Sequence, residues 1–220
     1  MEGGWRNGKR RSVRIHFPDG IRWRPAQEQP LIKKGDFDSQ NIAFWSAHEE
    51  RYLCYFRTFL ESFIRPGLDP RNWVARANYP ALGLIQTGAA ELSVYVVRHY
   101  GQPSIHIERM SLRLDGFASL HAPYSGGEMV TRPLIFDGSE LELNMATGAA
   151  GFVRVELLTA EGGPLPGCAL GDCPEVIGDR IERIVRWRQG SDLRALAGRP
   201  VRLRFVMKDA DVYSFRFRGR

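Results

Sequence analysis

The stretch GDFDSQNIAFW, residues 35–45, places acidic, hydroxyl and amide side chains directly before an apolar, aromatic run. A carboxylate such as Asp38 can act as an acid, a base or a nucleophile. The amides of Gln40 and Asn41 offer donors and acceptors to hydroxyl groups. The same residue types also form turns through their side chains. The stretch is therefore either a ligand-contacting loop or a turn before a strand.

A second polar cluster, formed by Arg98, His99 and Tyr100, ends the aromatic run ELSVYVVRHY at 91–100. A histidine exchanges its proton near neutral pH, and a tyrosine ring can stack on the face of a sugar ring. No carboxylate or nucleophile lies at a recognisable spacing from His99 in the sequence. The cluster is a candidate for ligand contact, and simple solvation of a histidine at a strand end is the alternative.

Other chemistries find little support in the sequence. There is no GxSxG elbow for acyl transfer and no phosphate-binding loop, so we expect no cofactor. Cys168 and Cys173 lie in the loop PGCALGDCPE without a nearby His or third Cys, so we expect no metal site there. If the protein is exported, a small disulfide between them is an alternative.

The elements that position the candidate residues are predicted to be strands. In the first half, PDGIRW at 18–23 and LDPRNW at 68–73 each predict an Asp-containing turn leading into a strand that carries the Trp. Each is followed by an aromatic strand run, at 51–59 and at 91–100. A period near 50 residues with several strands per unit is typical of propeller blades, and two blades do not close a propeller.

The second half contains six strand candidates, at 129–136, 139–147, 151–160, 180–187, 200–208 and 211–218. Turns are predicted at 137–139, 147–151 and 161–167, and one helical turn at 191–198. Val201, Leu203 and Phe205 alternate with polar residues, as expected for an antiparallel β-sandwich with one wet face. We therefore predict an all-β chain: partial propeller-like blades over 1–111, then a jelly-roll-like sandwich over 112–220.

The aromatic residues of the second half raise the question of a sugar-binding platform. Trp187, Tyr124 and Tyr213 are the candidates. Trp187 ends an apolar strand, and Tyr213 alternates in step with Phe215 and Phe217. We therefore expect Trp187 and Tyr213 in the core.

These motifs also resemble a known group. DGIRW…FDSQNIAFW…YLCYFR and NYPALGLIQTGAAELSVYVVRHYGQ resemble blades of the five-bladed β-propeller glycoside hydrolases of the family 32, 43 and 68 group. RLDGFASLHAPYSGG and GRPVRLRFVMKDADVYSFRF are similar to the C-terminal sandwich of such proteins. Several blades, expected between about residues 60 and 68, are missing by this comparison. The resemblance implies a sugar site near the propeller axis, with Asp38 as its catalytic candidate.

Hydrolysis of a glycosidic bond needs two carboxyl groups on either side of the bond. No second carboxylate matches an acid motif of the group, so we expect a glycan-related protein of weak or no hydrolase activity alone. Its predicted ligand contacts are Gln40, Asn41, Arg98, His99 and Tyr100. The alternatives are a non-catalytic carbohydrate-binding module, or a structural fragment whose open blades are covered by another copy or a partner chain.

Charge and hydropathy limit which other partners are expected. The net charge is +6, but the arginines run from Arg6 to Arg220 without clustering, so we expect no nucleic acid partner. No apolar run reaches membrane-spanning length, and no apolar stretch follows the basic N-terminal residues. As written, the chain is expected in the cytoplasm without membrane contact, and outside the cell if its N-terminus is truncated.

Overall fold

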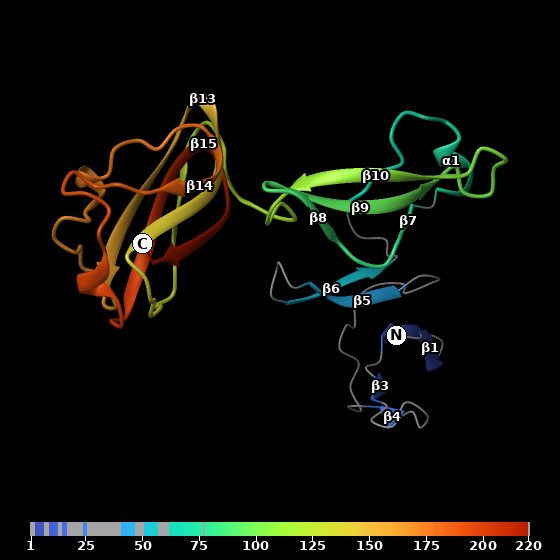
Figure 1. Ribbon diagram of the computed structural model, residues 1–220, viewed down its shortest axis with the longest axis horizontal. Coiled ribbons are helices and arrows are strands. Elements are labelled where there is room, and N and C mark those ends of the chain that lie inside the picture. The colour runs from blue at the N-terminus through green and yellow to red at the C-terminus, as the bar shows by residue number, and fades with distance from the viewer. Residues whose placement is uncertain are drawn as a thin grey trace. The chain divides into compact units, whose positions relative to one another are not determined.

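The computed structural model describes residues 3–6, 9–12, 15–16, 24–25, 41–46, 51–56, 62–76 and 78–219. The chain divides into two compact units, Met1–Leu112 and Arg113–Arg220. Almost all regular structure in both is strand, which confirms the prediction of an all-β fold (Figure 1). The arrangement of the first unit as propeller blades stays a prediction.

Among the described residues of the first unit, three strand pairs precede its sheet. They are β1 (Gly3–Arg6) with β2 (Lys9–Ser12), β3 (Ile15–His16) with β4 (Arg24–Pro25), and β5 (Asn41–Ser46) with β6 (Arg51–Phe56). Each pair is antiparallel. β6 falls within the aromatic run predicted as a strand at 51–59.

A four-stranded sheet follows in the first unit. It consists of β7 (Tyr79–Pro80), β8 (Ile85–Gly88), β9 (Glu91–Arg98) and β10 (His106–Arg113), with β9 hydrogen-bonded to the other three. Leu92, Val94 and Val96 of β9 are buried, as the apolar alternation of this run requires. The loop 99–105 joins β9 to β10 and carries the candidate residues His99 and Tyr100 (Figure 1).

The predicted strand around Trp73 is wrong, because Trp73 lies in the one-turn helix α1 (Asn72–Ala75). Asp69 and Pro70 cause the difference. The backbone N–H of Arg71 donates to Asp69 Oδ1 at 3.0 Å, and the N–H of Trp73 donates to the Pro70 carbonyl at 3.0 Å. Asp and Pro favour a tight turn, and here that turn leads directly into α1 instead of a strand.

The second unit is a five-stranded sheet with two short 3₁₀ turns. Its strands are β11 (Leu120–Ala122), β12 (Gly127–Val130), β13 (Glu140–Thr159), β14 (Asp179–Ile184) and β15 (Val201–Arg218). The order is β11-β15-β13-β14, and β12 also pairs with β15. The turns are η1 (Leu170–Asp172) and η2 (Arg194–Leu196), the latter within the helical turn predicted at 191–198.

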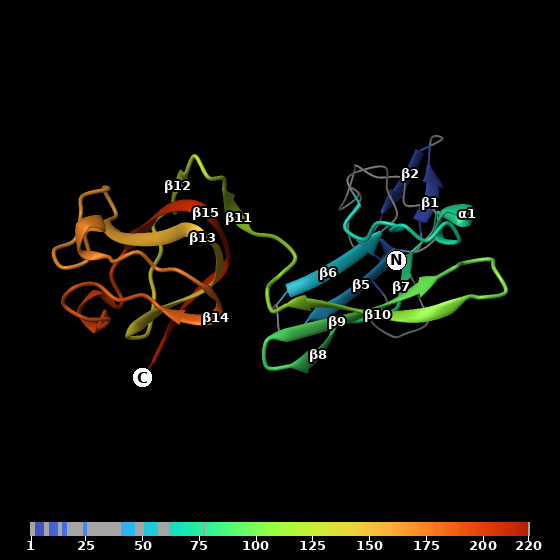
Figure 2. The same cartoon turned by 90° about the horizontal axis from the view of Figure 1, so that it is seen from above.

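The turn predicted at 147–151 is wrong, because these residues lie inside the continuous strand β13 (Figure 2). The register of β13 against β15 shifts between Thr147 and Phe152, which marks a β-bulge opposite Asp209. Asp209 has a left-handed φ of 43°. A Cβ on Gly151 would lie 2.7 Å from the Lys208 carbonyl oxygen and still closer to that of Asp209. Glycine is needed here so that the two backbones can approach.

One hydrophobic core fills the second unit. It takes Leu141 and Leu143 from before the bulge of β13, and Val153 and Val155 from after it, all fully buried. Since both halves of one strand contribute to the same core, the sheet folds over itself at the bulge. The result is the sandwich-like architecture expected for this half.

The alternation predicted for β15 is confirmed in its first half. Val201, Leu203 and Phe205 are at most 2% exposed. In its second half the predicted apolar face is only partly buried: Phe215 and Phe217 pack against the core while partly exposed, and Tyr213 is not among the residues packed there. A second register shift pairs Asn144 with Ser214 and Met145 with Val212, so Tyr213 is left without a partner in the register and is only half-buried.

The other residues singled out in the second half lie as follows. Trp187 is buried, as predicted, and its Nε1–H donates to the Val155 carbonyl at 3.0 Å. Tyr124 is exposed, with Lys208 Nζ 4.1 Å from its ring centroid. Cys168 and Cys173 are buried free thiols.

Candidate functional site

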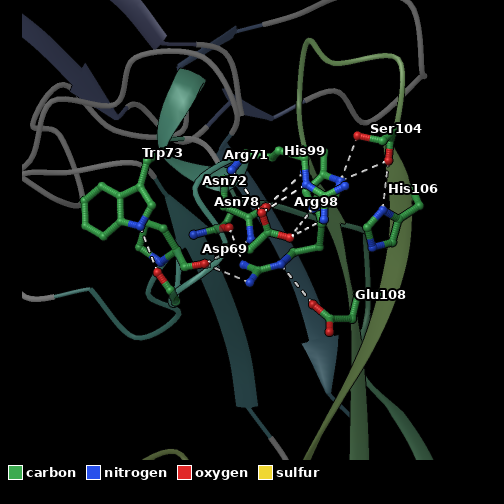
Figure 3. Close-up of polar contacts among 12 residues, drawn as sticks. Asp69, Arg71, Asn72, Trp73, Asn78, Arg98, His99, Ser104, His106 and Glu108 are labelled. Atoms are coloured by element: carbon green, nitrogen blue, oxygen red, sulfur yellow. Dashed lines mark hydrogen bonds and ion pairs between the residues drawn. The ribbon is translucent and has the colours of Figure 1, made fainter.

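The predicted site residues divide between the described and undescribed parts of the chain. Asp38 and Gln40 lie outside the described residues. Asn41 begins β5, where its backbone pairs with Phe56. Arg98, His99 and Tyr100 are described: Arg98 ends β9, and His99 and Tyr100 follow it. Arg98 and His99 lie in a dense polar cluster (Figure 3).

Arg98 connects Pro66 and Asn78 to the sheet. Its guanidinium is almost fully buried and donates from Nη1 to Asn78 Oδ1 at 2.8 Å and from Nη2 to the Pro66 carbonyl at 2.9 Å. Nε forms an ion pair with Glu108 Oε2 at 2.9 Å. Because all three guanidinium nitrogens bond to other residues of the protein, Arg98 has a structural role and supports the site without facing a ligand.

His99 is the centre of the cluster and is 6% exposed. Its backbone has a left-handed φ of 51°, a conformation that costs a non-glycine residue about 1–3 kcal/mol. The His99 backbone N–H donates to Asn72 Oδ1 at 3.0 Å, and Asn72 Nδ2 donates to the Pro66 carbonyl at 3.0 Å. The buried Asn72 side chain therefore holds the strained turn in place.

The imidazole of His99 connects two segments that are remote in sequence. Nε2 lies 2.9 Å from Asp69 Oδ2, and Nδ1 lies 3.0 Å from Ser104 Oγ and 3.1 Å from the Ser104 carbonyl oxygen. The same carbonyl lies 3.0 Å from Nδ1 of His106, whose ring meets that of His99 edge-on at 4.7 Å between centroids. Figure 3 shows this chain of contacts from Asp69 through His99 to Ser104.

Asp69 is ionised at neutral pH. The guanidinium of Arg71 donates to both carboxylate oxygens, at 3.0 and 2.8 Å, and the Arg71 backbone N–H donates to Oδ1. These bonds hold the pKa of the Asp69 carboxyl well below its usual range, with a smaller contribution from His99. An ionised carboxylate only accepts, so Nε2 of His99 must carry a proton.

Two large aromatic side chains border the cluster at the surface. Trp73 follows Asn72 in the chain and is 52% exposed; Tyr100 follows His99 and is 44% exposed. The residues that precede them in the chain are linked, because the His99 backbone N–H donates to the Asn72 side chain. Trp73 is fixed by its Nε1–H bond to the Gly67 carbonyl at 2.8 Å, and Tyr100 packs edge-on against Tyr79 at 4.9 Å between ring centroids.

Sequence reasoning identified His99 and Tyr100 but missed Asp69, Asn72 and Ser104. Ser104 lies only five residues after His99, so a search for a hydroxyl near the histidine would have found it. Asp69 and Asn72 come from a loop about 30 residues earlier. The Asp-Pro turn was visible in the sequence, but not the element that it would face.

The cluster offers no evident place for a metal ion. Across the described ranges, no group of three or more His, Cys, Asp and Glu side chains is arranged to hold one.

No helix among the described residues is long and apolar enough to span a membrane.

Comparisons with known proteins add no family assignment. No protein-family model, no curated protein and no solved structure matches the chain. The function of the chain is therefore inferred from the geometry of the site.

Proposed function

We propose that this chain is a glycan-related protein that binds carbohydrate at the Asp69–His99 end of the β7–β10 sheet, without glycoside hydrolase activity of its own. The observation that carries the proposal is the pair of half-exposed aromatic residues, Trp73 and Tyr100, beside a rigid polar cluster. The C–H face of a pyranose ring is apolar and packs on an aromatic ring, while its hydroxyl groups need polar partners.

Polar partners for the sugar hydroxyls are present at the surface of the cluster. The Arg71 side chain is 56% exposed, and within the described residues its Nη1 has no hydrogen-bond partner. Glu108 presents a carboxylate that is 45% exposed. A planar guanidinium and a carboxylate can each bond two neighbouring hydroxyl groups, which suits the geometry of a sugar ring edge.

The low pKa of Asp69 argues against hydrolysis of glycosidic bonds at this cluster. A glycosidase requires one carboxyl group that stays protonated to act as the acid. Asp69 is held in the opposite state by Arg71. The catalytic role of Asp38, which the propeller resemblance implies, remains a separate prediction.

A glycan array followed by titration of the best ligand tests the proposal. We expect Tyr100→Ala to weaken binding about tenfold, equivalent to about 1.4 kcal/mol. Tyr124→Ala is the matched control, because Tyr124 is also an exposed tyrosine but belongs to the second unit. Binding should survive Asp38→Asn.

Two results would contradict the proposal. One is the absence of any glycan bound by the chain. The other is release of sugar from an aryl glycoside panel that Asp38→Asn abolishes, which would make the chain a glycoside hydrolase.

A further inference from the structure

Asp69, His99 and Ser104 form an unbroken hydrogen-bonded chain from a carboxylate through an imidazole to a hydroxyl. The two links measure 2.9 Å and 3.0 Å (Figure 3). His99 is buried, whereas Ser104 is exposed in the loop between β9 and β10. A hydroxyl at the surface with an imidazole behind it is the arrangement that activates a serine nucleophile.

The protonation pattern of the chain is set by Asp69. In the tautomer of His99 that donates to the ionised carboxylate, the proton lies on Nε2 and the Nδ1 lone pair faces the Ser104 hydroxyl. The Ser104 carbonyl oxygen, 3.1 Å from the same nitrogen, gains a hydrogen bond from His99 only when Nδ1 is protonated. Nδ1 is therefore in position to accept the serine proton. The ring nitrogens are used in the opposite order to the common serine triad, but the roles depend on the geometry and not on the atom name.

The imidazolium that would form also has a partner in place. Once Nδ1 is protonated, it can donate to the Ser104 carbonyl oxygen at 3.1 Å, while Nε2–H still donates to Asp69. The ring already lies within hydrogen-bond distance of Asp69, of the Ser104 hydroxyl and of the Ser104 carbonyl, so both states use the same ring position. Preorganisation of this kind lowers the cost of proton transfer.

We propose that Ser104 is a nucleophile that takes acyl groups from carboxylic esters. In the first step, Ser104 Oγ bonds to the ester carbonyl carbon, its proton passes to His99 Nδ1, and the alcohol leaves with a proton. In the second step, water attacks the acyl-serine, and the carboxylic acid and free Ser104 are released. This activity is independent of the carbohydrate proposal and does not require it.

The test uses the full 220-residue chain and a fluorophosphonate probe, which phosphonylates an activated serine with loss of fluoride. Mass spectrometry should locate the label on Ser104. Ser104→Ala should abolish it, and Ser125→Ala, another exposed loop serine, should retain it. Hydrolysis of p-nitrophenyl acetate, whose leaving group needs no protonation, should show the same pattern.

The role of the imidazole is tested by His99→Gln, which should slow labelling at least about 100-fold, as expected for loss of a general base. If that variant fails to fold, Asp69→Asn provides a second measurement, with slowed labelling of a folded chain. The proposal is overturned if Ser104 is not labelled under conditions that label a known serine hydrolase. It is also overturned if neither variant slows labelling, or if Ser125 is labelled equally.

Discussion

The hydrogen bond between the His99 backbone and Asn72 makes the order of the candidate site depend on one buried amide side chain. In Asn72→Ala, the Pro66 carbonyl keeps Arg98 as a donor, but the buried N–H of His99 loses its acceptor. An unsatisfied buried N–H costs about 1–3 kcal/mol. The strain of the left-handed φ at His99 adds to the tendency of the turn to open.

The assay for Asn72→Ala is hydrogen exchange at the His99 amide, read by NMR. A loss of about 1–3 kcal/mol corresponds to a fall in protection of between about fivefold and 150-fold. We expect the loop 99–105 to lose protection together with that amide. Binding at the proposed carbohydrate site should fall as well, since Tyr100 belongs to the same turn.

Asn78→Ala is the matched control for Asn72→Ala. Its side chain bonds Arg98 and the Ile64 carbonyl rather than the backbone of His99. Protection of the His99 amide should therefore be nearly unchanged. If Asn78→Ala lowers it as much as Asn72→Ala does, or if neither variant changes it, the assignment of the turn to Asn72 is refuted.

Three further predictions concern the second unit and are measured by urea denaturation. Gly151→Ala should destabilise by about 1–3 kcal/mol because its Cβ would overlap the backbone at Asp209, whereas Gly171→Ala, which has open space around it, should not destabilise; equal effects would contradict the bulge argument. Trp187→Phe should cost about 1–3 kcal/mol because the buried Val155 carbonyl loses its donor, and an unchanged midpoint would refute this. Burial raises the pKa of the Cys168 thiol to about 11, so the folded state keeps the thiol proton to a higher pH than the unfolded chain does. The free energy of unfolding should therefore fall between about pH 9 and pH 11. Cys168→Ala should remove part of this dependence on pH.

Period-two alternation predicted the second unit best, because it reports burial of one face directly. Val201, Leu203 and Phe205 follow it without exception. The turn predicted at 147–151 was wrong because small residues and glycines are typical of both turns and bulges. What decides between them is Asp209, a partner about 60 residues away whose backbone must approach Gly151.

The candidate site was predictable only as far as a strand end is visible in sequence. His99 and Tyr100 end an aromatic strand, which marks them as exposed to a ligand or to solvent. The structure adds that His99 is buried, because a loop about 30 residues earlier covers it with Asp69 and Asn72. Such a covering loop follows from long-range packing, and no local pattern specifies it.

Both proposals use the same cluster, but its bonds separate their chemistry. Both oxygens of Asp69 are already bonded to Arg71, and Oδ2 also meets His99, so Asp69 has little capacity left for a sugar hydroxyl. Its chemical effect therefore passes through His99 toward Ser104, while sugar contact falls to Arg71 and the aromatic side chains. It follows that Tyr100→Ala should weaken glycan binding without slowing serine labelling. Ser104→Ala should abolish serine labelling without weakening glycan binding. If each variant loses both glycan binding and serine labelling, the cluster has one function and not two.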